Sequence, residues 1–227
     1  MKICLLIKRI INKPLPNLTK IMIIMGFFLT LVQVNRVGGS VVANALSNIH
    51  KLTPAEIGVV IGVMFLSSAL VQIPFGIMLD RFGARRMIVG WSSVAIIGTV
   101  IFGLAETSSG LTVGRTLIGI GHGASITGVY LLALAWASPE RVASVAATTI
   151  AVAGALGGMI GTAPLAAAIE YLGFTDTFLY LALVSLVSSI LIWFFVNDKP
   201  PGTRMENTKE HPKVAIMGLF KVIKDKN

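Results

Sequence analysis

The sequence predicts an all-α membrane protein of six transmembrane helices, arranged as two inverted three-helix repeats. Three observations lead to this prediction: the composition, the spacing of the charged residues, and a short pattern that recurs at the ends of helices two and five. Hydrophobic residues make up 55% of the 227 positions and charged residues only 13%, whereas soluble domains average about 25% charged residues. The composition therefore excludes an ordinary soluble domain.

The charged residues divide the chain into apolar stretches long enough to cross a bilayer. A hydrocarbon core of ~30 Å needs about 20 apolar residues in an α-helix. Four stretches carry no charge, and two others carry one arginine each. The predicted helices comprise residues 21–45, 57–79, 87–105, 111–136, 142–169 and 177–196.

Each predicted helix has its own boundaries. The first follows the basic segment 1–20 and contains Arg36, and the fourth contains Arg115. The other four are uncharged between flanking charges, which are Glu56 and Asp80, Arg86 and Glu106, Arg141 and Glu170, and Asp176 and Asp198. The chain thus divides into a basic N-terminal segment (1–20), a transmembrane bundle (21–196) and a polar, basic tail (197–227), whose last stretch is predicted to form a short interfacial helix.

The distribution of lysine and arginine predicts the orientation. With the N-terminus in the cytoplasm, sixteen of the nineteen basic residues lie on the cytoplasmic side, as the positive-inside rule requires. We therefore expect a multi-pass protein of the inner membrane with both termini in the cytoplasm. The net charge of +9 is explained by this topology and by anionic lipid, so nucleic acid is not an expected partner.

A short sequence pattern that occurs twice indicates the inverted repeat. Helix two ends in "LDRFG" (residues 79–83) and helix five ends in "IEYLG" (residues 169–173), so that an apolar residue, an acid and a glycine recur at the same spacing. The two copies lie on opposite sides of the predicted bilayer. Inverted three-helix units in transporter folds have this relationship.

Polar residues inside the spans are the candidate binding residues. An ionisable side chain in a bilayer usually faces a cavity or a partner, and Arg36, Arg115 and His122 all lie within predicted helices, with Asn35 beside Arg36. Arg115 also has two other interpretations, in which it reaches the outer headgroups or caps carbonyls of a neighbouring helix, and His122 is also compatible with a packing role. Two arginines without an acid in these spans suit an anionic solute, and a histidine offers proton coupling.

The sequence gives no sign of enzymatic chemistry or of a cofactor. A single cysteine, Cys4, and three scattered histidines provide no metal-ligand spacing. A six-span serine protease is the enzyme class that fits the topology, but "GASIT" (residues 123–127) lacks the final glycine of Gly-x-Ser-x-Gly, and no histidine occurs in helices five or six. We therefore predict no catalytic residues, no metal and no cofactor.

The stretch "GIMLDRFGARR" (residues 76–86) resembles the loop between helices two and three of the major facilitator superfamily. The family pattern Gly-x-x-x-Asp-Arg-x-Gly-Arg-Arg/Lys is matched, with Ala84 as one extra residue, by Gly76, Asp80, Arg81, Gly83, Arg85 and Arg86. "GRTLIGIGHGA" (residues 114–124) is similar to the family's arginine and glycines in helix four. "VNRVGGSVV" (residues 34–42) resembles helix one of organic-anion branches, where an arginine contacts the substrate.

The resemblance implies a fold, a motion and a partner. It covers nearly all of residues 20–196 and identifies them with the N-terminal half of a transporter of twelve spans, in which two six-helix bundles alternate around a central cavity. It implies that Gly76 and Asp80 dock against the other half, and that an arginine of the motif pairs with Glu140 in the next inner loop.

The expected function is therefore secondary transport of a small polar solute, with an anion favoured and protons as a candidate coupling ion. The expected partners are the lipid bilayer, the solute, and a second six-helix half, which is either a second copy or a separate chain. The alternatives are a truncated, non-transporting remnant and a membrane assembly subunit.

Overall fold

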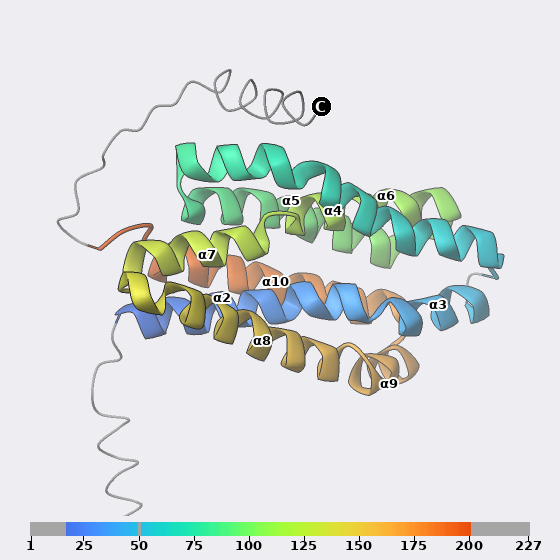
Figure 1. The fold of residues 1–227 in the computed structure, drawn as a ribbon. Helices are drawn as coiled ribbons and strands as arrows, with labels where there is room; N and C mark the ends of the chain where they lie inside the picture. Colours follow the sequence, from blue (N-terminus) through green and yellow to red (C-terminus); the bar gives the residue numbers. More distant parts are fainter. Residues whose placement is uncertain (1–16, 50, 201–227) are drawn as a thin grey trace, which may run out of the picture.

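The computed structural model describes residues 17–49 and 51–200, which form a bundle of long, roughly parallel helices (Figure 1). The helices are α2 (Asn17–Val37), α3 (Gly39–Asn48), α4 (Pro54–Phe82), α5 (Ala84–Leu104), α6 (Ser108–His122), α7 (Ser125–Trp136), α8 (Val142–Ile160), α9 (Ala163–Leu172) and α10 (Phe174–Phe195), with the 3₁₀ turn η1 (Pro139–Arg141) before α8. Within the described part, six helical spans are long and apolar enough to cross a membrane. The predicted fold class is confirmed. The basic segment up to residue 16 and the predicted interfacial helix lie outside the described residues.

The first, fourth and fifth spans are each broken, whereas the sequence predicted continuous helices. α2 gives way to α3 at Gly38, α6 to α7 at Gly123 and Ala124, and α8 to α9 at Gly161 and Thr162. Glycine lies at all three breaks, because it tolerates the local change of direction that the helix makes there. The expected single helices over 21–45, 111–136 and 142–169 are corrected accordingly.

Helix starts are specified locally by the sequence. Before α4, the Thr53 hydroxyl accepts the N–H of Glu56 while the Glu56 carboxylate accepts the N–H of Thr53 at 2.9 Å, and Pro54 follows at the first helical position. Before α6, the Thr107 hydroxyl accepts the N–H of Gly110 at 3.2 Å. These caps satisfy N–H groups that have no partner within the helix.

The connection between α4 and α5 is a single residue. The sequence predicted a loop over 80–86, but α4 continues to Phe82 and α5 begins at Ala84, so only Gly83 separates them. The same arrangement joins α9 to α10 through Gly173. Two helices that meet at one residue must reverse direction within it, and both glycines have a positive φ, which side chains other than hydrogen rarely allow.

Glycines also determine how closely the helices pack. A Cβ at Gly119 would collide with the Met64 carbonyl and the Ser67 hydroxyl of α4, and a Cβ at Gly157 would collide with Gln33 and the Thr30 carbonyl of α2. α6 therefore lies backbone to backbone against α4, and α8 against α2. Close approach of this kind replaces the hydrophobic drive that is missing between helices in lipid.

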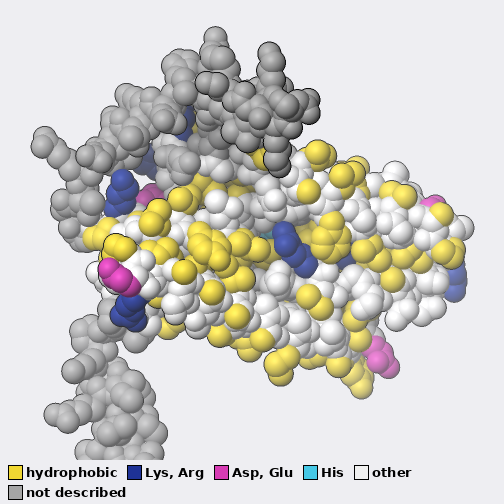
Figure 2. All heavy atoms as spheres, in the orientation of Figure 1, with side chains coloured by type: hydrophobic (Ala, Val, Ile, Leu, Met, Phe, Trp, Pro, Cys, Tyr) yellow, Lys and Arg dark blue, Asp and Glu magenta, His cyan; other side chains and the backbone are white. Residues whose placement is uncertain are grey.

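The outer surface of the bundle is apolar along its flank. Figure 2 shows yellow side chains over the length of the helices, with acidic and basic side chains mostly near the two ends. One end, called here the basic end, carries Arg81, Arg85 and Arg86 at the α4–α5 junction and Arg141 before α8. This distribution is the one that a bilayer-spanning bundle needs.

Candidate functional site

Arg115 of α6 is enclosed by protein, with 2% of its surface exposed. One guanidinium nitrogen donates to the carbonyl of Asn35 at 3.1 Å and lies 3.4 Å from the sulfur of Met64. The guanidinium carbon also lies 4.4 Å from the centre of the Phe102 ring, a cation–π contact that strengthens when water is excluded. Arg115 therefore joins α6 to α2, α4 and α5 at one point.

The Asn35 carbonyl receives this bond next to the break in the first span. Across the break, the N–H of Gly38 donates to Val34 at 3.0 Å and the N–H of Val42 donates to Gly38 at 2.9 Å. A carbonyl near a helix end needs a partner from outside the helix, and Arg115 supplies it. The interpretation in which Arg115 caps carbonyls of a neighbour is thus the arrangement that the structure has.

Arg36 lies one position beyond Asn35 and has a different environment. Its side chain is half-buried, and a guanidinium nitrogen donates to the Ser68 hydroxyl of α4 at 3.1 Å. No carboxylate pairs with it among the described residues, and the sequence from 21 to 50 contains no acid at all. Arg36 is therefore more accessible than Arg115, the other cation among the predicted site residues of the spans.

His122 lies at the end of α6, just before the break, with 3% of its surface exposed. Its ring contacts Phe28 of α2 edge-on, with centroids 6.2 Å apart, and it is close enough to Arg36 for the two side chains to interact electrostatically. Its Nδ1 atom is buried and has no partner among the described residues. A buried ring nitrogen without a hydrogen-bond partner is energetically costly, which keeps His122 among the candidate binding residues.

Asn35 is the fourth predicted site residue. It is buried, its amide donates back to the Leu31 carbonyl at 3.1 Å, and its side-chain oxygen has no partner in the described structure. The predicted residues are thus gathered where α2, α4 and α6 meet. The sequence did not indicate Ser68, Met64 or Phe102 as their contacts, because neither the serine nor the apolar residues differ in sequence context from ordinary packing positions.

The motif of residues 76–86, at the α4–α5 junction, contacts the beginning of the tail. A carboxylate oxygen of Asp198 accepts the backbone N–H of Arg85 at 2.7 Å, and the other oxygen lies 2.6 Å from where a Cβ on Gly83 would be. The Arg85 guanidinium donates to the Asn197 side chain at 3.3 Å and lies 4.9 Å from the Trp193 ring. The Trp136 N–H donates to the Asn197 carbonyl at 2.8 Å. We call Asp198, Asn197, Arg85 and Trp136 the clasp.

The clasp caps α5 from a distance. A helix N-terminus has free N–H groups and a partial positive charge, and a carboxylate placed there satisfies both. Asp198 does this from 113 positions away, and a glycine at 83 leaves the room that its carboxylate occupies. The sequence indicated Asp198 only as the end of the last span, since nothing local shows that residue 198 returns to residue 85.

The remaining motif residues are distributed around this junction. Arg81 lies over the Phe82 ring at 5.4 Å, Arg86 is exposed, and Glu140 is exposed in η1. No ion pair joins Glu140 to Arg85 or Arg86 in the described conformation, so the expected pairing stays a prediction. A Cβ at Gly76 would meet nothing within 4 Å, which leaves this part of α4 open to a partner.

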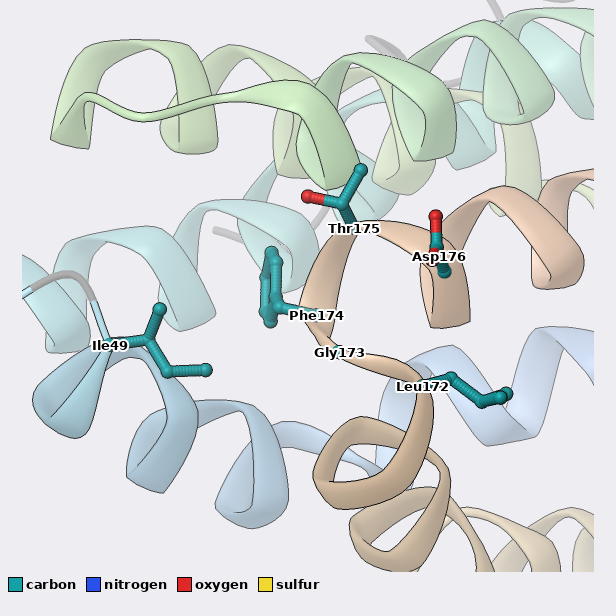
Figure 3. A pocket seen from close by; sticks show the side chains of 6 residues that line it. All are labelled: Ile49, Leu172, Gly173, Phe174, Thr175 and Asp176. Carbon is teal, nitrogen blue, oxygen red and sulfur yellow. The ribbon is translucent and has the colours of Figure 1, made fainter.

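A cavity of about 320 Å³ lies at the other end of the bundle. It is lined by residues of the α9–α10 junction and the end of α3, namely Ile49, Leu172, Gly173, Phe174, Thr175 and Asp176 (Figure 3). None of these is a predicted site residue. Open space surrounds Gly173, whereas a carboxylate fills the corresponding space at Gly83.

Comparisons with known proteins agree with this architecture. The profile of the Major Facilitator Superfamily matches residues 20–227. An uncharacterized transporter of Buchnera aphidicola is 33% identical over 165 residues, which cover 72% of this chain and 41% of that protein. Probable anion transporter 5 of Arabidopsis thaliana is 27% identical over 206 residues, covering 88% of this chain and 45% of that protein.

Solved structures give the same fold. A bacterial homolog of the human lysosomal transporter Spinster, in an inward-facing and unoccupied conformation, superimposes with a TM-score of 0.69 at 17% identity, covering 93% of this chain and 49% of that one. This chain therefore spans less than half the length of the relatives that it matches, which agrees with the prediction of a half. Because the family profile covers nearly all of the bundle and the tail, this chain belongs to the Major Facilitator Superfamily.

Proposed function

We propose that the bundle is the N-terminal half of a secondary transporter that moves a small anionic solute by alternating access, without enzymatic chemistry. The observation that carries the proposal is Arg36: a half-buried cation beside the break in the first span, held by one serine hydroxyl and faced by no carboxylate among the described residues. An uncompensated cation inside a transmembrane bundle is costly unless it serves a ligand or a pathway.

Arg36 and Arg115 have different roles in this proposal. Arg115 is enclosed and already bonded to Asn35 and Phe102, so it holds the broken first span in place beside the site. Arg36 has guanidinium N–H groups left to offer a carboxylate, sulfonate or phosphate, and arginine suits these planar or branched oxyanions. The name of the Arabidopsis relative, an anion transporter, agrees with this class of solute.

His122 is the proposed proton-coupling group. It is buried next to the α6–α7 break, interacts electrostatically with Arg36, and has an unpaired Nδ1. An anion that binds Arg36 would reduce the positive field at the imidazole and so favour its protonation. Solute binding and proton uptake would then be linked at one place.

The proposed partner is a second six-helix half, which would complete the cavity. The spans of α4 and α8 are the least buried in this bundle, with 22% and 17% of their most apolar stretch covered, against 61% for the span of α6 and α7. Gly58, Gly62 and Gly76 on α4 and Gly158 on α8 have open space where a Cβ would be. Small residues on an open face suit a closely packed helix.

We also propose that the basic end faces the cytoplasm of a bacterial-type inner membrane, because arginines gather there and not at the opposite end. A cysteine at position 141 should then react with a membrane-impermeant maleimide only after the membrane is opened, and a cysteine at position 107 before it is opened. The reverse pattern would overturn the orientation.

The test of the solute site uses Arg36→Gln, with Arg141→Gln as a matched loss of charge at the surface. The chain, reconstituted with a second half, is titrated with inorganic phosphate, sulfate and small carboxylates. Loss of a charge-assisted hydrogen bond should weaken binding at least tenfold for Arg36→Gln, and Arg141→Gln should bind as the unaltered chain does. Equal affinities in both variants would remove Arg36 from the site.

A further inference from the structure

A shallow groove runs between α5 and α10 on the outer surface of the bundle, away from the proposed solute site. Its volume is about 160 Å³, and it is lined by Val89 and Ser93 on α5 and by Leu186, Ser189, Ile190, Trp193 and Phe194 on α10. α5 and α10 pack against each other along their length, and the groove lies where small side chains, Ser93 and Ser189, take the place of large ones.

The groove offers an apolar surface although two serines line it. The Ser93 hydroxyl donates to the Val89 carbonyl at 3.0 Å, and the Ser189 hydroxyl donates to the Ser185 carbonyl at 3.0 Å. Both donors are therefore satisfied inside their own helices. A polar solute would receive no hydrogen bond from these donors, and a hydrocarbon chain would leave no hydroxyl proton unpaired.

The groove leads toward a cation at the basic end. Val89, Gly90 and Ser93 lie three, four and seven positions after Arg86, which places all four residues on one face of α5. Gly90 has open space where a Cβ would be, so Val89 is the only residue with a side chain on this face of α5 between Ser93 and Arg86. The ring of Trp193 lies at the same end, and tryptophan prefers the level of the lipid headgroups.

Arg86 is the arginine of this end that the protein leaves available beside the groove. Arg85 is held by Asn197 and by the Trp193 ring, and Arg81 lies over the ring of Phe82. Arg86 is exposed and has no hydrogen-bonding or charged partner within the described residues. Its charge is therefore free to meet an anion at the membrane surface.

We propose that the groove binds an anionic glycerophospholipid, with one acyl chain between α5 and α10 and the phosphate on Arg86. The charge of Arg86 complements the headgroup, and the satisfied hydroxyls of the groove suit the acyl chain. The site uses the outer faces of two helices and none of the residues assigned to the solute, and Arg86 is its one residue from the motif at the α4–α5 junction. One arginine at the membrane surface increases the affinity for an anionic headgroup about fivefold.

The test uses Trp193 as a reporter in vesicles. The chain is reconstituted in phosphatidylcholine vesicles that contain a small fraction of either dibrominated phosphatidylglycerol or dibrominated phosphatidylcholine, and the quenching of Trp193 is obtained as the difference from Trp193→Phe. We expect phosphatidylglycerol to quench at about one-fifth of the concentration that phosphatidylcholine requires. Arg86→Gln should remove this preference, and Arg141→Gln, an exposed arginine of the same end, should keep it.

A second variant separates the groove from the headgroup contact. Ser93→Phe fills the groove without changing any charge, and it should reduce quenching by both brominated lipids. Equal quenching by the two lipids in the unaltered chain, or a preference that survives Arg86→Gln, would overturn the proposal. Exclusion of both lipids from Trp193, with efficient energy transfer between labelled copies of the chain, would show that a second copy covers the groove and would overturn it equally.

Discussion

Gly83 and Gly173 have the same backbone conformation ninety residues apart: φ is 86° and ψ 151° at Gly83, and φ is 89° and ψ 163° at Gly173. Each glycine ends one helix and begins the next. The N–H of Gly83 donates to Leu79 and that of Gly173 to Ile169, both at 3.0 Å. The short match between "LDRFG" and "IEYLG" thus corresponds to two turns of closely similar backbone geometry, as expected for an inverted repeat of three-helix units.

The two glycines should differ in their tolerance of alanine. Both conformations belong to a region that is essentially restricted to glycine, so alanine should cost about 1–3 kcal/mol at either position. At Gly83 the new Cβ would also meet the Asp198 carboxylate, whereas at Gly173 it would meet nothing within 4 Å. Gly83→Ala should therefore lower the thermal unfolding midpoint in detergent micelles more than Gly173→Ala. A larger effect at Gly173 would contradict the proposed crowding by Asp198.

Asp198→Ala should destabilise the start of α5. The carboxylate accepts the Arg85 N–H, and replacing a capping residue by alanine costs about 1 kcal/mol. Hydrogen exchange at residues 84–87, measured by mass spectrometry, should accelerate in the variant. Glu170→Ala is the control, because Glu170 is an exposed acid at the opposite junction. If exchange at the start of α5 is equal in both variants, Asp198 does not cap this helix in solution.

The sequence predicted the spans better than their breaks or contacts. Because lipid excludes charge over a fixed length, the spacing of charged residues along the sequence is enough to locate a span. The six spans were therefore predicted to within a few residues. The breaks at Gly38, Gly123 and Gly161 were missed because many glycines of this chain lie inside intact helices, such as Gly62 and Gly90. Glycine alone does not distinguish a break from a packing position.

The sequence predicted the roles of side chains only where the role follows from the depth of the residue in the membrane. Depth in the membrane indicated that Arg36 and Arg115 are exceptional, but their difference arises from helix rotation: Arg115 faces Phe102 and Asn35, while Arg36 stays half-exposed. The clasp could not be predicted for a related reason. Its central contact joins residues 113 positions apart, and that pairing depends on how α10 and α5 are aligned along their axes.

Substitution of Arg115 should destabilise the bundle much more than substitution of Arg36. Arg115→Ala leaves a cavity and an unpaired Asn35 carbonyl, and should cost about 3 kcal/mol of folding free energy. Arg36→Gln loses a single bond to Ser68 and should cost about 1 kcal/mol or less. Denaturant unfolding in micelles measures both. Arg115→Lys keeps the charge but loses the planar face on Phe102, so it should fall between them. A neutral Arg115→Ala would show that this arginine does not hold the four helices together.

Gly119 and Gly62 form a matched pair on neighbouring helices, α6 and α4. A Cβ at Gly119 would collide with the Met64 carbonyl and the Ser67 hydroxyl, while one at Gly62 would meet nothing within 4 Å. Backbone atoms cannot move aside cheaply in a packed interface, so Gly119→Ala should destabilise the bundle by about 1–3 kcal/mol. Gly62→Ala should leave it unchanged or stabilise it by about 0.5–1 kcal/mol, because alanine loses less backbone freedom in a helix.

The same pair separates packing within the bundle from docking against a second half. Thermal unfolding of the six-helix bundle alone should show the loss at Gly119 and none at Gly62. The yield of cross-linking to a second half should instead be sensitive to position 62. Gly62→Leu places a large side chain on the open face of α4 and should reduce this yield. Leu134→Ala, at an exposed position on α7, should leave the yield unchanged. If Gly62→Leu lowers the stability of the isolated bundle as much as it lowers cross-linking, the open face of α4 is needed for folding and not for the partner.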